Sequence, residues 1–130
     1  MSWTFESSTG TLFDPSGKLA ATGYAGGDKG LHKEGINNPQ LQNVHDIGPL
    51  PEGIYTMGDP VEGSHLGPLA IPLTPDPNNQ MFGRSSFFIH GDRIGAEGTA
   101  SDGCIILAHD IRTLLSQSDD RQMQVIAVRS

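Results

Sequence analysis

The sequence predicts a mainly β fold, a single β-sandwich-like domain over residues 1–130 with one short helix near residues 110–116. Three observations predict it. The chain has 130 residues, enough for one hydrophobic core but not for two. It contains 17 Gly and 9 Pro, well above the average share of about 12 % for these two residues, which favours short strands and tight turns over a helical bundle. Several segments also alternate apolar and polar residues, the period of a half-buried strand.

The N-terminal region predicts three short strands. Residues 2–6 alternate, with Trp3 and Phe5 on one face, as expected of a strand with one buried side. Two turn-forming stretches, Ser-Thr-Gly and Asp-Pro-Ser-Gly, come next. They separate two further predicted strands, over residues 11–13 and 18–22.

Glycine and proline dominate the middle of the chain. Residues 23–35 are so rich in glycine that we expect an irregular surface loop there. Almost all the prolines lie between Pro39 and Pro77, and proline interrupts the hydrogen-bond ladder of a sheet. This stretch therefore predicts only short strands, over residues 53–58 and 69–73.

The chain after Pro77 contains no proline, and its patterns are clearer. Aromatic and β-branched residues at positions 86–90 predict an interior strand. A second apolar stretch begins at residues 104–107. Residues 122–128 alternate again and predict a strand that closes the fold.

One segment has helical periodicity. Within residues 110–116, the apolar side chains of Ile111, Leu114 and Leu115 recur at the spacing of one helix face. Asp110 comes directly before them and is of a type that favours the N-cap position. The segment predicts a short helix that begins at Asp110.

Composition excludes several classes of function. The formal net charge is −7, the wrong sign for neutralising phosphates, so we expect no nucleic-acid partner. The single cysteine excludes an internal disulfide framework and a Cys-rich zinc site. No apolar run reaches the roughly 18–20 residues that a membrane span needs. The first residues lack the basic and apolar regions of a secretory signal, so we expect the protein to be made in the cytoplasm without one.

Cys104 and His90 stand out as candidates for chemistry. A thiol nucleophile needs a base that takes its proton and donors that hold the oxyanion formed on the attacked carbonyl. His90 ends one apolar strand, and Cys104 opens the next apolar stretch. Gly103 allows a tight turn and the close approach of a substrate carbonyl. If the two segments are neighbouring strands, both side chains meet at one end of the sheet.

Simpler interpretations compete with this one. A lone cysteine is more often a small buried apolar residue than a nucleophile. Gly91 and Asp92 follow His90 and are placed to orient its imidazole, although a solvated carboxylate is an equally ordinary role for Asp92. His109, at the start of the predicted helix, is the rival base. The histidines lack the spacing of metal ligands, so we expect no metal site.

The motifs around these residues resemble those of the L,D-transpeptidase family. They are Ile-His-Gly at residues 89–91 and Ser-Asp-Gly-Cys-Ile at residues 101–105, where that family pairs a histidine with a downstream Ser/Thr-His-Gly-Cys on a β-sandwich. Residues 48–57 resemble the family's Pro-x-Gly-x-Tyr/Phe strand. The match is closer still to the compact branch of type VI secretion effectors, and it extends over most of the chain.

Two positions depart from the ordinary enzymes. Asp102 occupies the position of their histidine before Gly-Cys, and its carboxylate raises the pKa of the thiol if it faces the sulfur. Ile106 occupies the position of an arginine that suits a substrate carboxylate. We expect Arg84 or Arg93 to replace that arginine as a substrate-binding residue.

The resemblance implies an acyl-transfer reaction on peptidoglycan. Cys104 would attack the carbonyl of meso-diaminopimelate in a stem tetrapeptide and release D-alanine. Water would resolve the thioester in an L,D-carboxypeptidase, and a D-amino acid or stem-peptide amine in an L,D-transpeptidase. His90 would accept and return the proton, and no metal or organic cofactor is needed. The oxyanion would be held by the N–H groups of Gly103 and Cys104, with that of Asp102 as a further candidate, in the turn that Ser101, Asp102 and Gly103 form.

The resemblance also implies partners and a place of action. A type VI secretion apparatus would deliver the protein into the periplasm of a target bacterium, and the producing cell would need an immunity protein. Two alternatives remain open at this point. One is a non-catalytic wall-binding module on the same fold, and the other is an endopeptidase that cuts elsewhere in the stem.

Overall fold

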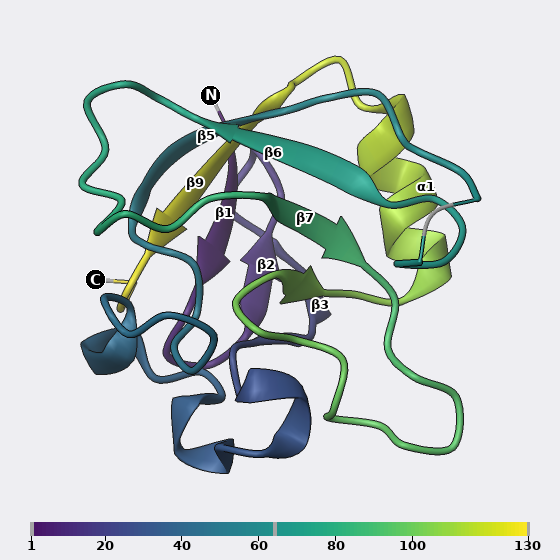
Figure 1. Ribbon diagram of the computed structural model, residues 1–130. Helices are drawn as coiled ribbons and strands as arrows, with labels where there is room; N and C mark the ends of the chain where they lie inside the picture. The colour runs from purple at the N-terminus through teal and green to yellow at the C-terminus, as the bar shows by residue number, and fades with distance from the viewer. Residues whose placement is uncertain (1, 64, 130) are drawn as a thin grey trace.

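Nine short strands form one sheet in the computed structural model, which describes residues 2–63 and 65–129 (Figure 1). The order across the sheet is β3-β2-β1-β9-β5-β6-β7-β8-β4. The strands are β1 Trp3–Glu6, β2 Thr11–Phe13, β3 Leu19–Thr22, β4 Tyr24–Ala25, β5 Gly53–Met57, β6 Ile71–Pro75, β7 Phe87–His90, β8 Ile105–Ile106 and β9 Gln122–Ile126. One α-helix, α1 His109–Gln117, lies between β8 and β9 in the chain.

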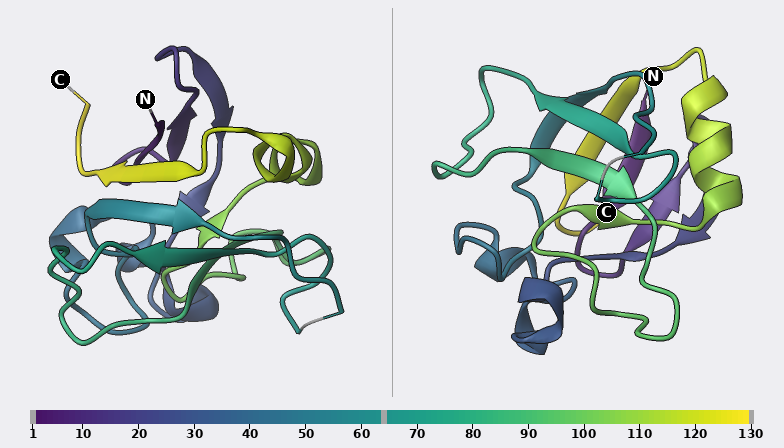
Figure 2. Two further views of the ribbon diagram at one scale, coloured as in Figure 1. Left: turned by 90° about the horizontal axis from the view of Figure 1, so that it is seen from above. Right: turned by 45° about the vertical axis from the view of Figure 1, so that its right-hand side comes forward.

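The sheet curves until it is nearly closed (Figure 2). Its two edge strands, β3 and β4, are consecutive in the chain and only Gly23 separates them. Most neighbouring strands are antiparallel, but β1 with β9 and β7 with β8 are parallel. The mainly β prediction is confirmed, and the opposing layers belong to one continuous curved sheet.

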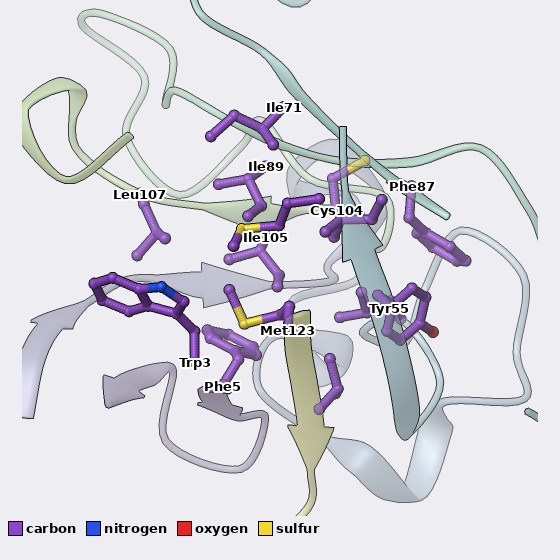
Figure 3. Packing of buried hydrophobic residues seen from close by; sticks show 14 of the residues in the cluster. Trp3, Phe5, Tyr55, Ile71, Phe87, Ile89, Cys104, Ile105, Leu107 and Met123 are labelled. Carbon is purple, nitrogen blue, oxygen red and sulfur yellow. The ribbon is translucent and has the colours of Figure 1, made fainter. Parts of the chain in front are cut away.

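The concave side of this sheet holds the hydrophobic core. Trp3 and Phe5 of β1 are buried, as their alternation predicts, and they pack with Met123 of β9. Cys104 lies at the margin of the same cluster, and Figure 3 shows its sulfur on the side away from Tyr55 and Met123. The core therefore fixes the backbone of Cys104 from one side.

The glycine-rich segment is more regular than expected. Residues 23–35 contain strand β4 and two 3₁₀ helices, η1 Asp28–Gly30 and η2 Lys33–Gly35; a third, η3 Pro39–Leu41, follows. The prediction of an irregular loop was wrong because β4 pairs with β8, far along the chain. The backbone N–H of Ala25 also donates to Oδ1 of Asn37 over 3.1 Å, which holds the segment in place.

The helix is present, but its buried face differs from the predicted one. Ala108, not Asp110, is the N-cap residue of α1, and Asp110 lies in the first turn. Leu114 is 50 % exposed, whereas Arg112 and Leu115 are the buried residues of the helix. An arginine replaces a leucine inside because backbone carbonyls accept hydrogen bonds from its guanidinium.

The other predicted strands match the structure to within two residues at their ends, the usual uncertainty of boundaries. The largest differences are at β6, which lies two residues later than predicted, and at β9, which ends at Ile126. Within the described ranges, no helix has the length and apolar character needed to cross a membrane.

Candidate active site

Cys104 and His90 face the same side of the parallel pair β7–β8. His90 is the ladder partner of Ile106, and Cys104 precedes Ile106 by two residues. Side chains two residues apart on an extended chain point to the same face. The two segments are neighbouring strands, which was the condition for their side chains to meet, since β7 and β8 are hydrogen-bonded to each other. Both side chains line one cleft of about 810 Å³.

The hydrogen bond of His90 fixes its neutral tautomer. Nδ1 lies 3.0 Å from the carbonyl oxygen of Gly91, and a carbonyl oxygen only accepts, so Nδ1 carries the proton. The other ring nitrogen, Nε2, is then the unprotonated one. Burial lowers the pKa of His90, although the Gly91 carbonyl and the charge of Asp102 act in the opposite direction. At neutral pH the imidazole is therefore a free base.

The thiol of Cys104 is protonated at rest. Burial raises the pKa of Cys104 to about 11. The N–H of Phe88, which donates to Sγ over 3.4 Å, acts in the opposite direction and lowers this pKa. The carboxylate of Asp102 raises this pKa further, as expected if it faces the sulfur, while the guanidinium of Arg84 lowers it. The resting pair is consequently a neutral thiol beside a neutral imidazole.

A single hydroxyl organises the turn before the cysteine. Ser101 is buried, and its Oγ donates to the carbonyl of Cys104 over 2.6 Å. The same oxygen accepts from the N–H of Gly26 at 2.8 Å and of Gly103 at 3.0 Å. Gly103 N–H is thus engaged inside the protein and is not free to hold the oxyanion, a role that the resemblance implied for it. The backbone N–H groups of Asp102 and Cys104, in the same turn, donate to no other residue that the structure describes.

Gly103 has a backbone that only glycine fits well. Its φ is +142°, and a Cβ there would lie 2.6 Å from Nη2 of Arg84 and 2.7 Å from a ring carbon of Phe87. Arg84 is buried, and its two terminal nitrogens donate to four carbonyl oxygens. These acceptors belong to Gln42, Pro49, Gly48 and Asp102. Arg84 therefore stabilises the turn before Cys104 through hydrogen bonds from inside the protein.

The loop between β7 and β8 forms one rim of the cleft and projects from the sheet (Figure 1). Asp92 lies at its start, where Oδ1 accepts from the hydroxyl of Tyr24 at 2.7 Å and from the N–H of Arg93 at 2.9 Å. Asp92 thus shapes the loop, and among the described residues it makes no hydrogen bond to His90. Arg93 is exposed at the rim of the cleft.

Sequence reasoning did not single out Tyr24 or Arg112. The Tyr24 hydroxyl joins the two ends of the β7–β8 loop, because it also accepts from the N–H of Ala100 at 3.0 Å. Arg112 is buried beside this region. Neither position carries a local signal, since the partners of Tyr24 and two of the three carbonyls that accept from Arg112 lie far away in the chain. No group of three or more His, Cys, Asp or Glu in residues 2–63 and 65–129 is arranged to hold a metal ion.

Comparison with known proteins gives one result. A family model described as the Tlde1 domain matches residues 21–129, a range that contains every residue of the site described above. No curated protein and no solved structure gives a significant match. The match covers well over half of the chain, so the chain belongs to the Tlde1 domain family, a family of type VI secretion effector toxins.

Proposed function

We propose that the protein is a cysteine-dependent L,D-carboxypeptidase and L,D-transpeptidase that acts on peptidoglycan stem tetrapeptides. The observation that carries the proposal is the pair Cys104 and His90, on one face of neighbouring strands and in one cleft. The resemblance of the motifs to L,D-transpeptidases supports the choice of substrate. Membership of a toxin family supports an antibacterial outcome.

The first step forms a thioester. Nε2 of His90 takes the proton of the Cys104 thiol as Sγ attacks the carbonyl carbon of meso-diaminopimelate. Because burial keeps the thiol protonated before substrate arrives, proton transfer accompanies the attack instead of preceding it. The imidazolium then gives this proton to the departing nitrogen, the C–N bond breaks, and D-alanine leaves with a free amine.

The oxyanion of the tetrahedral intermediate needs donors that are already in place. The N–H of Cys104 favours negative charge at its own sulfur, and the N–H of Asp102 belongs to the same turn. Both have no acceptor in another described residue. Ser101 fixes this turn through the carbonyl of Cys104, so the donors need no reorganisation during the reaction.

The second step releases the acyl group. His90 removes a proton from water or from the amine of a D-amino acid or stem peptide, which attacks the thioester carbonyl. The C–S bond breaks, and Sγ regains a proton from the imidazolium. Water yields a shortened stem peptide, and an amine yields an exchanged or cross-linked one. The step requires no oxidant, reductant or cofactor.

Family membership implies delivery by a type VI secretion apparatus into target cells and an immunity protein in the producing cell. We place the site of action in the periplasm of the target, where stem peptides are found. Expression with a Sec signal fused to the chain should be toxic to a Gram-negative host, and cytosolic expression should be harmless. Equal toxicity in both compartments would point to a cytosolic target.

Product masses from defined muropeptides test the proposed activity. The wild-type protein should convert a tetrapeptide to a tripeptide, and with an added D-amino acid it should also form the exchanged tetrapeptide. The Cys104→Ala variant should leave the substrate unchanged. Cleavage at another bond of the stem would instead identify an endopeptidase.

The burial of Cys104, which is only 5 % exposed, favours a second candidate, a non-catalytic wall-binding module. That module would bind stem peptides without changing their masses. Its affinity for them would be the same in the wild-type and Cys104→Ala proteins.

A further inference from the structure

A second cleft, of about 550 Å³, opens beside the active-site cleft. We call it the α1 cleft, because Ala108 and His109 at the N-terminal end of α1 line it. The two clefts share Gly67, Gly91 and Ile94 among their lining residues. A peptide bound at Cys104 can therefore extend into the α1 cleft without leaving the protein surface.

Arg112 contributes to the wall of the α1 cleft and is only 6 % exposed. Its Nε donates to the carbonyl of Leu107 at 3.0 Å, and Nη1 donates to the carbonyls of Pro68 at 2.7 Å and Leu69 at 3.3 Å. Among the described residues, no acceptor lies on Nη2. A Cβ on Gly91 would be 2.7 Å from Nη2, so this nitrogen lies against the residue that follows His90.

Two other arginines provide a comparison. Both terminal nitrogens of Arg84 donate to carbonyls, and so do both terminal nitrogens of Arg121, with Nη2 donating to Gly58 at 2.8 Å. These two side chains serve to hold loops. Arg112 holds the Pro68–Leu69 segment in the same way, but through Nη1 alone among its terminal nitrogens. Its Nη2 donates to no described residue.

The α1 cleft is lined by both Arg112 and Asp92, but the carboxylate of Asp92 already accepts from Tyr24, Arg93 and Gly98. Glu62 is the acid whose charge acts on Arg112, but its carboxylate accepts from the N–H of Leu69, and no ion pair joins it to Arg112 within the described ranges. Backbone carbonyls accept from this guanidinium but do not neutralise its charge, and a buried charge without a counterion is costly. The helix also begins without a side-chain cap. Asp110 Oδ1 accepts from the N–H of Ile111, which leaves the earlier N–H groups of α1 for a ligand.

We propose that the α1 cleft binds a free carboxylate of the peptide that Cys104 attacks, with Nη2 of Arg112 and the first N–H groups of α1 as its donors. The inference rests on the proposed function and adds the element that selects substrate. Arg112 thereby supplies the charge that Ile106, two residues after the nucleophile, does not. Its position beside Gly91 keeps the bound carboxylate close to His90.

The test compares tetrapeptides that carry a free or an amidated C-terminal carboxyl, with a third peptide amidated at the side-chain carboxyl of diaminopimelate. Wild-type kcat/KM should favour the unmodified peptide over one of the two amides by roughly 10- to 100-fold, the scale of a hydrogen bond between charged groups. The third peptide identifies which carboxylate occupies the cleft. In Arg112→Gln the ratio of kcat/KM between acid and amide should fall toward one, mainly because KM for the acid rises. Arg112→Lys should retain part of the preference.

Two further variants guard the interpretation. Arg121→Gln removes an arginine that holds loops away from the α1 cleft, and it should keep the wild-type acid preference. Gly91→Ala places a methyl against Nη2 and should lower the preference even if Arg112→Gln fails to fold. An acid preference that survives in both Arg112→Gln and Gly91→Ala would overturn the inference.

Binding to the Cys104→Ala protein separates this inference from the proposed reaction. Titration calorimetry should give tighter binding of the free acid than of the matching amide, and adding Arg112→Gln should abolish the difference. If this holds while the wild-type protein cleaves nothing, the cleft is correctly assigned and the reaction is wrong. Cleavage by wild type with equal binding of the free acid and of both amides would refute the assignment of the cleft.

Discussion

The backbone N–H of Phe88 donates to the sulfur of Cys104 over 3.4 Å. Because β8 begins only at Ile105, the sulfur takes the place of a backbone acceptor at the start of the β7–β8 ladder. This bond stabilises a thiolate, but burial outweighs it and raises the pKa of Cys104 to about 11. The sulfur is thus held in place by the sheet while it remains a thiol.

The rate of alkylation of Cys104 should depend steeply on pH. Only the thiolate reacts, and its folded pKa of about 11 predicts a rate with iodoacetamide that rises about tenfold per pH unit from pH 7 to 9. A plateau near neutral pH would instead reveal a thiolate–imidazolium pair at rest.

The pH profile of kcat/KM should have the midpoint of its acid limb below pH 6.5, because burial lowers the pKa of His90 and only the neutral imidazole accepts a proton.

His90→Ala should reduce turnover by roughly 10²- to 10⁴-fold, the usual effect of losing a general acid–base. His109→Ala is the matched control. His109 is exposed at the start of α1 and lines only the neighbouring cleft, so its loss should cost far less. Steady-state kinetics on a tetrapeptide compare the two, and a severe loss in His109→Ala with a mild one in His90→Ala would invalidate the pairing of His90 with Cys104.

Ser101→Ala should lower both the free energy of unfolding and kcat. The substitution removes the donor to Cys104 and the acceptor for two N–H groups, and unsatisfied buried groups cost about 1–3 kcal/mol each. Urea denaturation and kcat measure the two effects. Ser85→Ala, at an exposed position, should leave stability within about 0.5 kcal/mol of wild type. Equal behaviour of the two variants would mean that Ser101 does not organise the turn.

Arg84 and Arg93 should respond differently to glutamine. Arg84→Gln leaves buried carbonyls without their donor and should cost about 3 kcal/mol or more in the free energy of unfolding. Arg93 is exposed at the cleft, so Arg93→Gln should leave stability nearly unchanged and raise KM for the stem peptide. A stable Arg84→Gln protein with only a raised KM would make Arg84 a substrate-binding residue after all.

Alternation and apolar runs were enough to predict most strands. Trp3 and Phe5 face the core as their spacing indicates, and the run at 86–90 became the interior strand β7. The approach of His90 to Cys104 was also predictable, because both stand at the ends of apolar segments that a short loop connects. Local pattern is informative where one face of an element is buried against the core.

Long-range polar contacts were beyond the reach of sequence patterns. Arg112 is buried because carbonyls 44 and 43 positions away, at Pro68 and Leu69, accept from it. A helical pattern counts arginine as polar and therefore placed Leu114 inside. Strand β4 was missed for a similar reason, since its partner β8 lies about 80 residues later in the chain.

The central claim, that Cys104 is the nucleophile, is tested most directly by the intact mass of protein mixed with a stem tetrapeptide in single turnover and quenched with acid. The wild-type protein should gain the mass of the tripeptide acyl group, on Cys104 alone, and release D-alanine. The Cys104→Ala variant should keep its fold, gain no mass and lose turnover by on the order of 10³-fold or more. Release of D-alanine by Cys104→Ala at the wild-type rate would contradict the account.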